Sequence, residues 1–149
     1  MYHAFIRHQV RKSFAGLGTG TPSSEAGNLA PDVQHVFAGE SAIGGARRGP
    51  AAFVRWLERV YRLLPDLRFD VQDVIVSGGP FNTRVAVHWR SRATAVTGDA
   101  YANDGIHLIR MSKGKITDIR VFTDTEVIAR TLAAVAEKGI DEAAAPPLA

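Results

Sequence analysis

The spacing of the apolar residues changes at Leu67, and this change constrains the fold more than any single motif. Before it, apolar side chains recur every three or four residues over 2–17 and again after Pro50, which is typical of amphipathic helices. After it, apolar and polar residues alternate, which is typical of half-buried strands. Strands are expected from Leu67 and over 82–92, 101–111 and 115–123. Helices early in the chain and strands late predict an α+β domain with helices on one face of a sheet.

The connections between these strands are short and turn-like, so the strands are expected to form an antiparallel meander. Upstream, Thr21 and Pro22 fit the start of a short second helix that runs to Ala30. The segment Asp32–Phe37 has the pattern of a further short strand, and residues 38–50 that of a glycine-rich loop.

The last helix has a recognisable start. Thr123–Glu126 fits a capping box, and Gly139 marks the expected stop. Asp124 is therefore expected to be structural and not catalytic. We expect residues 1–140 to form a single domain and 141–149 an irregular tail, because that tail is too rich in Pro and Ala to pack strongly.

Composition excludes several classes of site. The chain has 149 residues and no cysteine, which excludes disulfides, thiolate nucleophiles and cysteine-based metal centres. Its five histidines lack the spacing of a zinc motif, so no metal and no cofactor are expected. The formal charge is only +3 and the arginines are scattered, so no nucleic-acid partner is expected. Without a signal peptide or an apolar run of roughly 20 residues, the chain is expected to be soluble and cytoplasmic, with no membrane partner.

A titratable ring interrupts an apolar strand in the run Gly105–Arg110, which reads GIHLIR. Side chains alternate on a strand, so Asn103 shares a face with His107. On the first strand, His35 has an apolar neighbour two residues away on each side, so we expect it to point inward. Periodicity alone does not say whether the face that carries Asn103 and His107 is the inner one.

Two questions stay open from periodicity alone. On strand 82–92, either the face with Trp89 or the face with His88 could be the inner one. The buried histidines, His35 and His107, could meet a ligand or could be core residues hydrogen-bonded to their neighbours.

The order of these segments resembles the SnoaL-like branch of the nuclear transport factor 2-like superfamily. The resemblance is carried by the first helix, by LAPDVQHVF, by GGARRGPAAFVRWLERVYRLLPDLRFDVQDVIVSG, by YANDGIHLIRMSKGKITDIRVFTDT and by the closing helix. It implies a cone in which a strongly curved antiparallel sheet wraps around helices and one apolar pocket. Members include polyketide cyclases, ketosteroid isomerases, limonene-epoxide hydrolases and scytalone dehydratases, together with binding modules that have no activity.

The resemblance also implies positions for pocket residues. It places on the pocket face Asn103, His107, His35 and Phe37. His107 stands where ketosteroid isomerases hold an acid that donates to an oxyanion. Phe37 stands at the place of their proton-shuttling aspartate, Ser13 at that of their donor tyrosine, and Val121 at that of an acid in the epoxide hydrolases. Neither reaction is therefore expected to proceed by the scheme of those enzymes.

The residues themselves suggest acid–base chemistry. An imidazole in an apolar pocket is pushed towards its neutral form, so His35 and His107 could act as base and acid in one turnover. Asn103 could hold a carbonyl or hydroxyl group by its amide. We expect Phe37, Trp56 and Val121 to line the substrate site, and His88 to join them if its face turns inward.

These patterns favour a cofactor-independent enzyme of the cyclase, isomerase or dehydratase type, acting on a small apolar ring or carbonyl compound. The alternative is a non-catalytic ligand-binding or accessory protein with the same fold, and a third reading is a subunit-interaction module. A homodimer is expected, because the outer face of a curved sheet still carries apolar residues that need cover.

Overall fold

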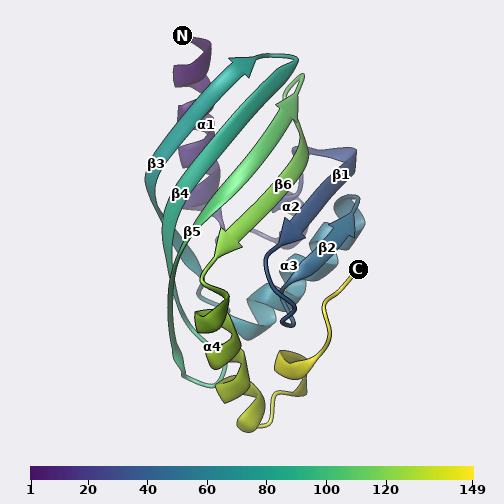
Figure 1. The fold of residues 1–149 in the computed structure, drawn as a ribbon, viewed down its shortest axis with the longest axis vertical. Helices are drawn as coiled ribbons and strands as arrows, with labels where there is room; N and C mark the ends of the chain where they lie inside the picture. Colours follow the sequence, from purple (N-terminus) through teal and green to yellow (C-terminus); the bar gives the residue numbers. More distant parts are fainter.

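A six-stranded curved sheet forms the body of the protein, and helices lie against one of its faces (Figure 1). The structure is a computed structural model and describes all 149 residues. The helices are α1 (Tyr2–Gly16), α2 (Pro22–Glu25), α3 (Pro50–Leu63) and α4 (Thr125–Glu137), with a short 3-10 helix η1 (Asp141–Ala144). The strands are β1 (Leu29–Phe37), β2 (Gly45–Arg48), β3 (Arg68–Gly79), β4 (Asn82–Thr94), β5 (Ala100–Ser112) and β6 (Lys115–Thr123).

The strand order is β2-β1-β6-β5-β4-β3, so the predicted meander of the last four strands is confirmed. The α+β class and the curved sheet are confirmed as well. One pair differs from the expectation of a purely antiparallel sheet, because β1 runs parallel to β6. A parallel pair needs a long crossover, and here α3 and the four strands β2, β3, β4 and β5 lie in the chain between β1 and β6.

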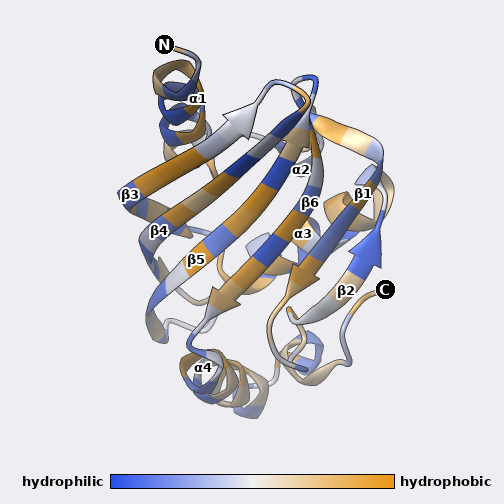
Figure 2. Cartoon of the chain, turned by 45° about the horizontal axis from the view of Figure 1, so that its top comes forward, coloured by the Kyte–Doolittle hydropathy of each residue, from blue (hydrophilic) through white to orange (hydrophobic).

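The inner face of the sheet is the one that carries Val85, Val87 and Trp89, which settles the open question on β4. These side chains pack with Val10 and Phe14 of α1 in one apolar cluster. Figure 2 shows the alternation of apolar and polar residues along the strands that this arrangement requires. A second cluster joins α3, α4 and the C-terminal segment at the other end of the sheet.

The last helix starts one residue later than a cap at Thr123 would place it. Asp124 is the capping residue, and its side chain accepts hydrogen bonds from the backbone N–H groups of Glu126 and Val127 at 3.0 and 3.3 Å. The Thr123 hydroxyl instead donates to the carbonyl of Asp104 on β5. The structural role expected of Asp124 is therefore confirmed.

The segments around β1 differ from the sequence expectation because pairing between distant strands extends them. β1 begins at Leu29, so α2 ends at Glu25 and does not reach Ala30. Residues 45–48 of the expected glycine-rich loop form β2, which pairs with the end of β1. Such non-local hydrogen bonding leaves no local signal in the sequence.

The C-terminal tail was expected to be irregular, yet part of it is ordered on the domain. Residues 141–144 form η1, and Ala143 is buried. The carbonyls of Pro146 and Leu148 accept hydrogen bonds from the buried side chains of Arg59 and Arg47. Buried guanidinium groups need acceptors, which is the physical reason the tail packs despite its composition. None of the helices has both the length and the apolar character needed to cross a bilayer.

Candidate functional site

A cavity of about 180 Å³ lies between the inner face of the sheet and helices α1, α2 and α3. Of the 23 residues that line it, 17 are hydrophobic, so an occupant must be largely apolar. The polar groups are few, and each can be traced to an element. The lining includes His35, His107, Ser91, Glu25, Tyr61, Asn28 and Ser13.

His107 enters the cavity from β5 with one ring nitrogen already bonded. Its Nδ1 accepts a hydrogen bond of 2.7 Å from Nε1 of Trp89. Because an indole N–H can only donate, Nδ1 carries no proton and the neutral ring carries its proton on Nε2. Nε2 has no hydrogen-bond partner within the protein. Burial lowers the pKa of His107 to about 3, so the ring is neutral at physiological pH.

Gly105 makes the contact between Trp89 and His107 possible. Trp89 and Gly105 are opposite each other in the ladder between β4 and β5. A Cβ atom at position 105 would lie 2.5 Å from the Trp89 ring and 2.7 Å from the carbonyl of Phe122. Only glycine lets the indole approach this strand so closely and reach the imidazole. The run GIHLIR thus contains both Gly105, which leaves room for the indole of Trp89, and His107, which accepts its hydrogen bond.

His35 lies on β1, and its Nδ1 also lies next to a hydrogen-bond donor, as in His107. Its Nδ1 lies 2.6 Å from a terminal nitrogen of Arg47, and a guanidinium can only donate. The proton of the neutral ring is therefore on Nε2, as in His107. The ring is 1% exposed and packs against Phe53 and Trp56, with ring centroids 5.1 and 4.3 Å away. Burial first, and the charge of Arg47 second, lower the pKa of His35 to about 2.

Arg47 is a buried cation without a carboxylate partner. Its other hydrogen bonds go to the backbone carbonyls of Gly44 and Leu148. Burial, and then the nearby charge of Arg59, lower its pKa to about 10, which still leaves it charged at neutral pH. Arg59 does meet a carboxylate, at 3.4 Å, in Glu142. A positive charge therefore stands directly behind His35.

A second polar site in the cavity joins α2 to α3. The Tyr61 hydroxyl donates to Oε2 of Glu25 at 2.8 Å, and the backbone N–H of Gly18 donates to Oε1 at 2.6 Å. Burial, together with the hydrogen bond to Glu25, raises the pKa of Tyr61 above its usual range. Glu25 is the one acidic side chain that lines the cavity. Sequence reasoning missed both residues, because Tyr61 lies on the apolar stripe of its helix and Glu25 in a short helix without periodicity.

Ser91 is a third residue of the cavity that the sequence did not single out. Its hydroxyl is the one buried side-chain polar atom of the structure that has no hydrogen-bond partner. The residue is 2% exposed and lies on the inner face of β4, where it lines the cavity. An unpaired buried hydroxyl costs about 1–3 kcal/mol, and a ligand or water in the cavity would remove that cost.

The expected site residues fall into two groups. Lining the cavity, as expected, are His35, His107, Phe37 and Trp56. Val121 does not line it, because it packs at 1% exposure in the core. His88 is corrected to the outer face, where its Nε2 lies 2.7 Å from a carboxylate oxygen of Asp104.

Asn103 points inward, as the family resemblance implied, but it does not line the cavity. Its side-chain nitrogen donates to the hydroxyl of Tyr101 and to the carbonyl of Asp124. Its side-chain oxygen accepts from the backbone N–H groups of Asp104 and Asp124. The amide is therefore committed to holding the start of α4. No group of three or more His, Asp or Glu side chains is arranged to hold a metal ion.

Comparison with known proteins bears on both fold and family. A family model for the SnoaL-like domain matches residues 10–119. No curated protein sequence matches the chain. An NTF2-like protein of unknown function from Burkholderia pseudomallei is 22% identical over 84% of this chain and 95% of its own, with a TM-score of 0.72.

Two further solved structures of similar fold contain small molecules. TerC, co-crystallised with polyporic acid, is 24% identical over 82% of this chain and 93% of its own, with a TM-score of 0.68. A protein with a ketosteroid isomerase-like fold from Catenulispora acidiphila, in complex with trimethylamine, is 18% identical over 82% and 91%, with a TM-score of 0.67. These identities establish a shared fold. Because the family model covers most of the chain, the resemblance seen in the sequence is confirmed, and the chain belongs to the SnoaL-like domain family.

Proposed function

We propose that this protein binds a small ring compound through an oxygen atom and catalyses a cofactor-independent reaction on it, of the isomerase, cyclase or dehydratase type. The observation that carries the proposal is the shared state of the two cavity histidines. Trp89 and Arg47 occupy both Nδ1 atoms, so each ring offers an Nε2–H donor to the cavity. A carbonyl or hydroxyl oxygen of a ligand is the acceptor that such donors fit.

The size and lining of the cavity support a single ring system. An enclosed apolar cavity of 150 Å³ holds benzene, and this one measures about 180 Å³. Phe37, Trp56 and Phe69 provide aromatic walls. TerC and the Catenulispora protein contain small molecules in the same fold, which agrees with a ligand of this kind.

The proposal changes the role first expected of the histidines. Rings whose pKa values are about 2 and 3 do not take up a proton at neutral pH, so exchange of a proton between them is not the mechanism we propose. They act instead as neutral donors that stabilise negative charge on an oxygen, which is worth about 2.7–4 kcal/mol for one such donor in a well-studied hydrolase. Neutral imidazole is an established electrophile for carbonyl groups.

Glu25 provides the proton acceptor, or general base, that the two histidines cannot provide. Each of its carboxylate oxygens accepts one hydrogen bond, from Gly18 or from Tyr61, so each keeps a lone pair free. A proton from a carbon next to the bound carbonyl can move to Glu25 while the histidines hold the enolate oxygen. Return of that proton to another carbon completes an isomerisation, and no oxidant or cofactor is needed.

The test uses 1-indanone, a bicyclic ketone with exchangeable protons beside its carbonyl, and indane, the matching hydrocarbon. Fluorescence of Trp56 and Trp89, which both line the cavity, reports binding. We expect 1-indanone to bind more tightly than indane by about 0.5–1.5 kcal/mol, the net value of a hydrogen bond. The His107→Leu variant should lose that preference. Equal binding of the two compounds to the wild-type protein contradicts the proposal.

Deuterium exchange separates an enzyme from a binding protein. Protein-catalysed exchange of the indanone protons in deuterated water, abolished by Glu25→Gln, supports catalysis. Binding without exchange supports the alternative, a non-catalytic ligand-binding protein. The exposed Glu40 provides a matched control, because Glu40→Gln should not change the exchange rate.

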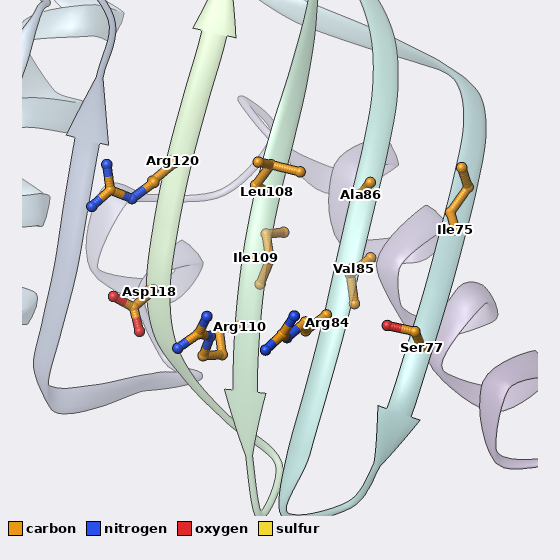
Figure 3. A pocket seen from close by; sticks show the side chains of 10 residues that line it. All are labelled: Ile75, Ser77, Arg84, Val85, Ala86, Leu108, Ile109, Arg110, Asp118 and Arg120. Atoms are coloured by element: carbon orange, nitrogen blue, oxygen red, sulfur yellow. The ribbon is translucent and has the colours of Figure 1, made fainter.

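We also propose that the protein is a homodimer joined through the outer face of its sheet. Ile75, Leu108 and Phe122 are 62%, 44% and 50% exposed there. Figure 3 shows a shallow hollow of this face, in which Leu108 and Ile75 lie above Arg84, Arg110 and Asp118. Asp118 forms no ion pair within the chain and could meet an arginine of a second copy.

Sedimentation tests the dimer directly. The wild-type protein should sediment as a dimer at micromolar concentration, and Leu108→Glu should sediment as a folded monomer. A monomeric wild-type protein contradicts this proposal and leaves the ligand site untouched.

A further inference from the structure

We infer that the cavity binds its ligand as an anion, so that the natural ligand is an acidic ring compound, a phenol or the enol of a dicarbonyl, bound as its conjugate base. This inference rests on the proposed function, since it assigns a charge to the oxygen that the histidines hold. It concerns the ligand and adds no step to the reaction.

The position of Arg47 carries the inference. The residue is 5% exposed, and one nitrogen of its guanidinium donates to Nδ1 of His35 at 2.6 Å. The same ring turns its Nε2–H to the cavity. An anionic ligand atom that accepts a hydrogen bond from Nε2–H would meet an imidazole whose Nδ1 is bonded to the positively charged Arg47. The polarised chain from Arg47 through His35 therefore favours negative charge on the ligand atom.

The charge of Arg47 is not cancelled locally. Its remaining hydrogen bonds go to the carbonyls of Gly44 and Leu148, and no carboxylate lies within ion-pair distance. Arg59 stands next to it, and the one carboxylate in the group, Glu142, is shared between Arg59 and the exposed Arg62. The cluster behind His35 thus keeps a positive excess that the protein itself does not neutralise.

The other groups around the cavity do not reverse this balance. His107 is neutral and adds a second N–H donor, and its proximity contributes to the lowered pKa of His35. Tyr61 stays protonated because burial raises its pKa. Glu25 is the one negative group in the lining, and it is held on α2 by Gly18 and Tyr61, whereas Arg47 and His35 lie on β2 and β1.

The cluster also explains why the C-terminal segment is ordered. Leu148 provides two of the hydrogen bonds that Arg47 makes, and Pro146 provides one to Arg59. A buried guanidinium whose acceptors are backbone carbonyls and the neutral ring of His35 is satisfied without being neutralised. The positive charge of Arg47 therefore remains beside the apolar cavity, whereas a carboxylate partner would have neutralised it.

The probe for this inference is 4-nitrophenol, a single-ring phenol whose anion is coloured and which titrates near neutral pH. Its absorbance is recorded against pH, free and with saturating protein. We expect the pKa of the bound probe to be lower than that of the free probe by about one unit or more, which is a tenfold preference for the anion. The histidines do not titrate in this range, so the change in absorbance reports the probe alone.

Two matched variants assign the effect to Arg47. Arg47→Met removes the buried charge, and Arg48→Met removes a charge at the next residue of β2, which is exposed. The first should return the pKa of the bound probe to its free value or above, and the second should leave it lowered. If Arg47→Met does not fold, Arg47→Lys, which keeps the charge, must keep the lowered pKa.

The outcomes separate this inference from the proposed function. A bound probe whose pKa is unchanged or raised in the wild-type protein overturns the anion inference, even if 1-indanone binds as expected. A lowered pKa that persists in Arg47→Met overturns the role of Arg47. Failure of both 4-nitrophenol and 1-indanone to bind contradicts the proposed function itself.

Discussion

A methyl group added at Gly105 should break the hydrogen bond between Trp89 and His107 in the wall of the cavity. In Gly105→Ala, the new Cβ would lie 2.5 Å from the indole, whereas ordinary contacts begin at 3.4 Å. The second close atom is the backbone carbonyl of Phe122, which cannot retreat, so the indole must move by about 0.9 Å. Such a displacement of the indole should lengthen or bend the hydrogen bond from its Nε1 to His107, which is 2.7 Å in the wild-type protein, and so weaken or break it.

The energetic cost has two parts. Overpacking of a well-filled site costs about 1–3 kcal/mol, and an indole N–H left without a partner costs about 1–3 kcal/mol more. The free energy of unfolding should therefore fall by about 2–6 kcal/mol. For a chain of this length, each kcal/mol lowers the melting temperature by roughly 3–4 °C, so the change is large.

Thermal unfolding followed by circular dichroism measures the loss, and nitrogen NMR of the His107 ring measures the broken contact. Gly79→Ala is the matched control, because a Cβ there meets nothing within 4 Å. An unchanged melting temperature, combined with an unchanged His107 spectrum in Gly105→Ala, would refute this account of the GIHLIR run.

Three further predictions concern single groups. Asp124→Ala should lower stability by about 0.5–2 kcal/mol through loss of the helix cap, as measured by urea unfolding; activity loss at unchanged stability would instead make the acid functional. Ser91→Ala should leave the unliganded protein as stable or more stable, because it removes an unpaired buried hydroxyl, and a calorimetric melt that drops by several degrees would contradict this. Because His35 and His107 have pKa values of about 2 and 3 when folded and near 6.5 when unfolded, the unfolded chain takes up protons first as the pH falls. Stability should therefore be full above about pH 6.5 and decline below it by about 1.4 kcal/mol per pH unit for each histidine, and His107→Leu should halve that slope in urea unfolding at a series of pH values.

Much of the fold could be predicted because its signals are local. The change of period at Leu67 and the alternation along 82–92, 101–111 and 115–123 identify the meander, and the family resemblance places His107 on the pocket face. The cavity could be predicted as well, because the family resemblance implies a cone-shaped fold with one apolar pocket. The strand pattern depends on side-chain spacing, which the sequence displays directly.

What escaped prediction depends on contacts between distant segments. Asn103 has the right parity, but the start of α4 arrives beside it and takes all its hydrogen bonds. Arg47 lies in a glycine-rich stretch that becomes β2 only by pairing with β1, and the tail that binds it follows about a hundred residues later in the chain. His88 has a carboxylate neighbour across the ladder that fixes it on the outer face.

The same reason explains why the chemistry of the histidines was misjudged from sequence. Burial of an imidazole can be expected from an apolar run, but the group that bonds Nδ1 cannot. Trp89 reaches His107 across the ladder only because Gly105 is bare, and Arg47 reaches His35 from a neighbouring strand. These two donors decide the tautomer, and the tautomer decides whether a ring offers a proton or accepts one.

Nitrogen NMR of the imidazole rings reports the protonation states of His35 and His107. Long-range proton–nitrogen spectra of the unliganded protein at pH 7 and pH 5 distinguish neutral rings protonated on Nε2, neutral rings protonated on Nδ1, and charged rings. We predict that His35 and His107 are both neutral and protonated on Nε2 at both pH values, and that addition of 4-nitrophenol shifts their Nε2 signals and not those of the exposed His8. A charged ring at pH 5, or a proton on Nδ1 of either histidine, would contradict the account.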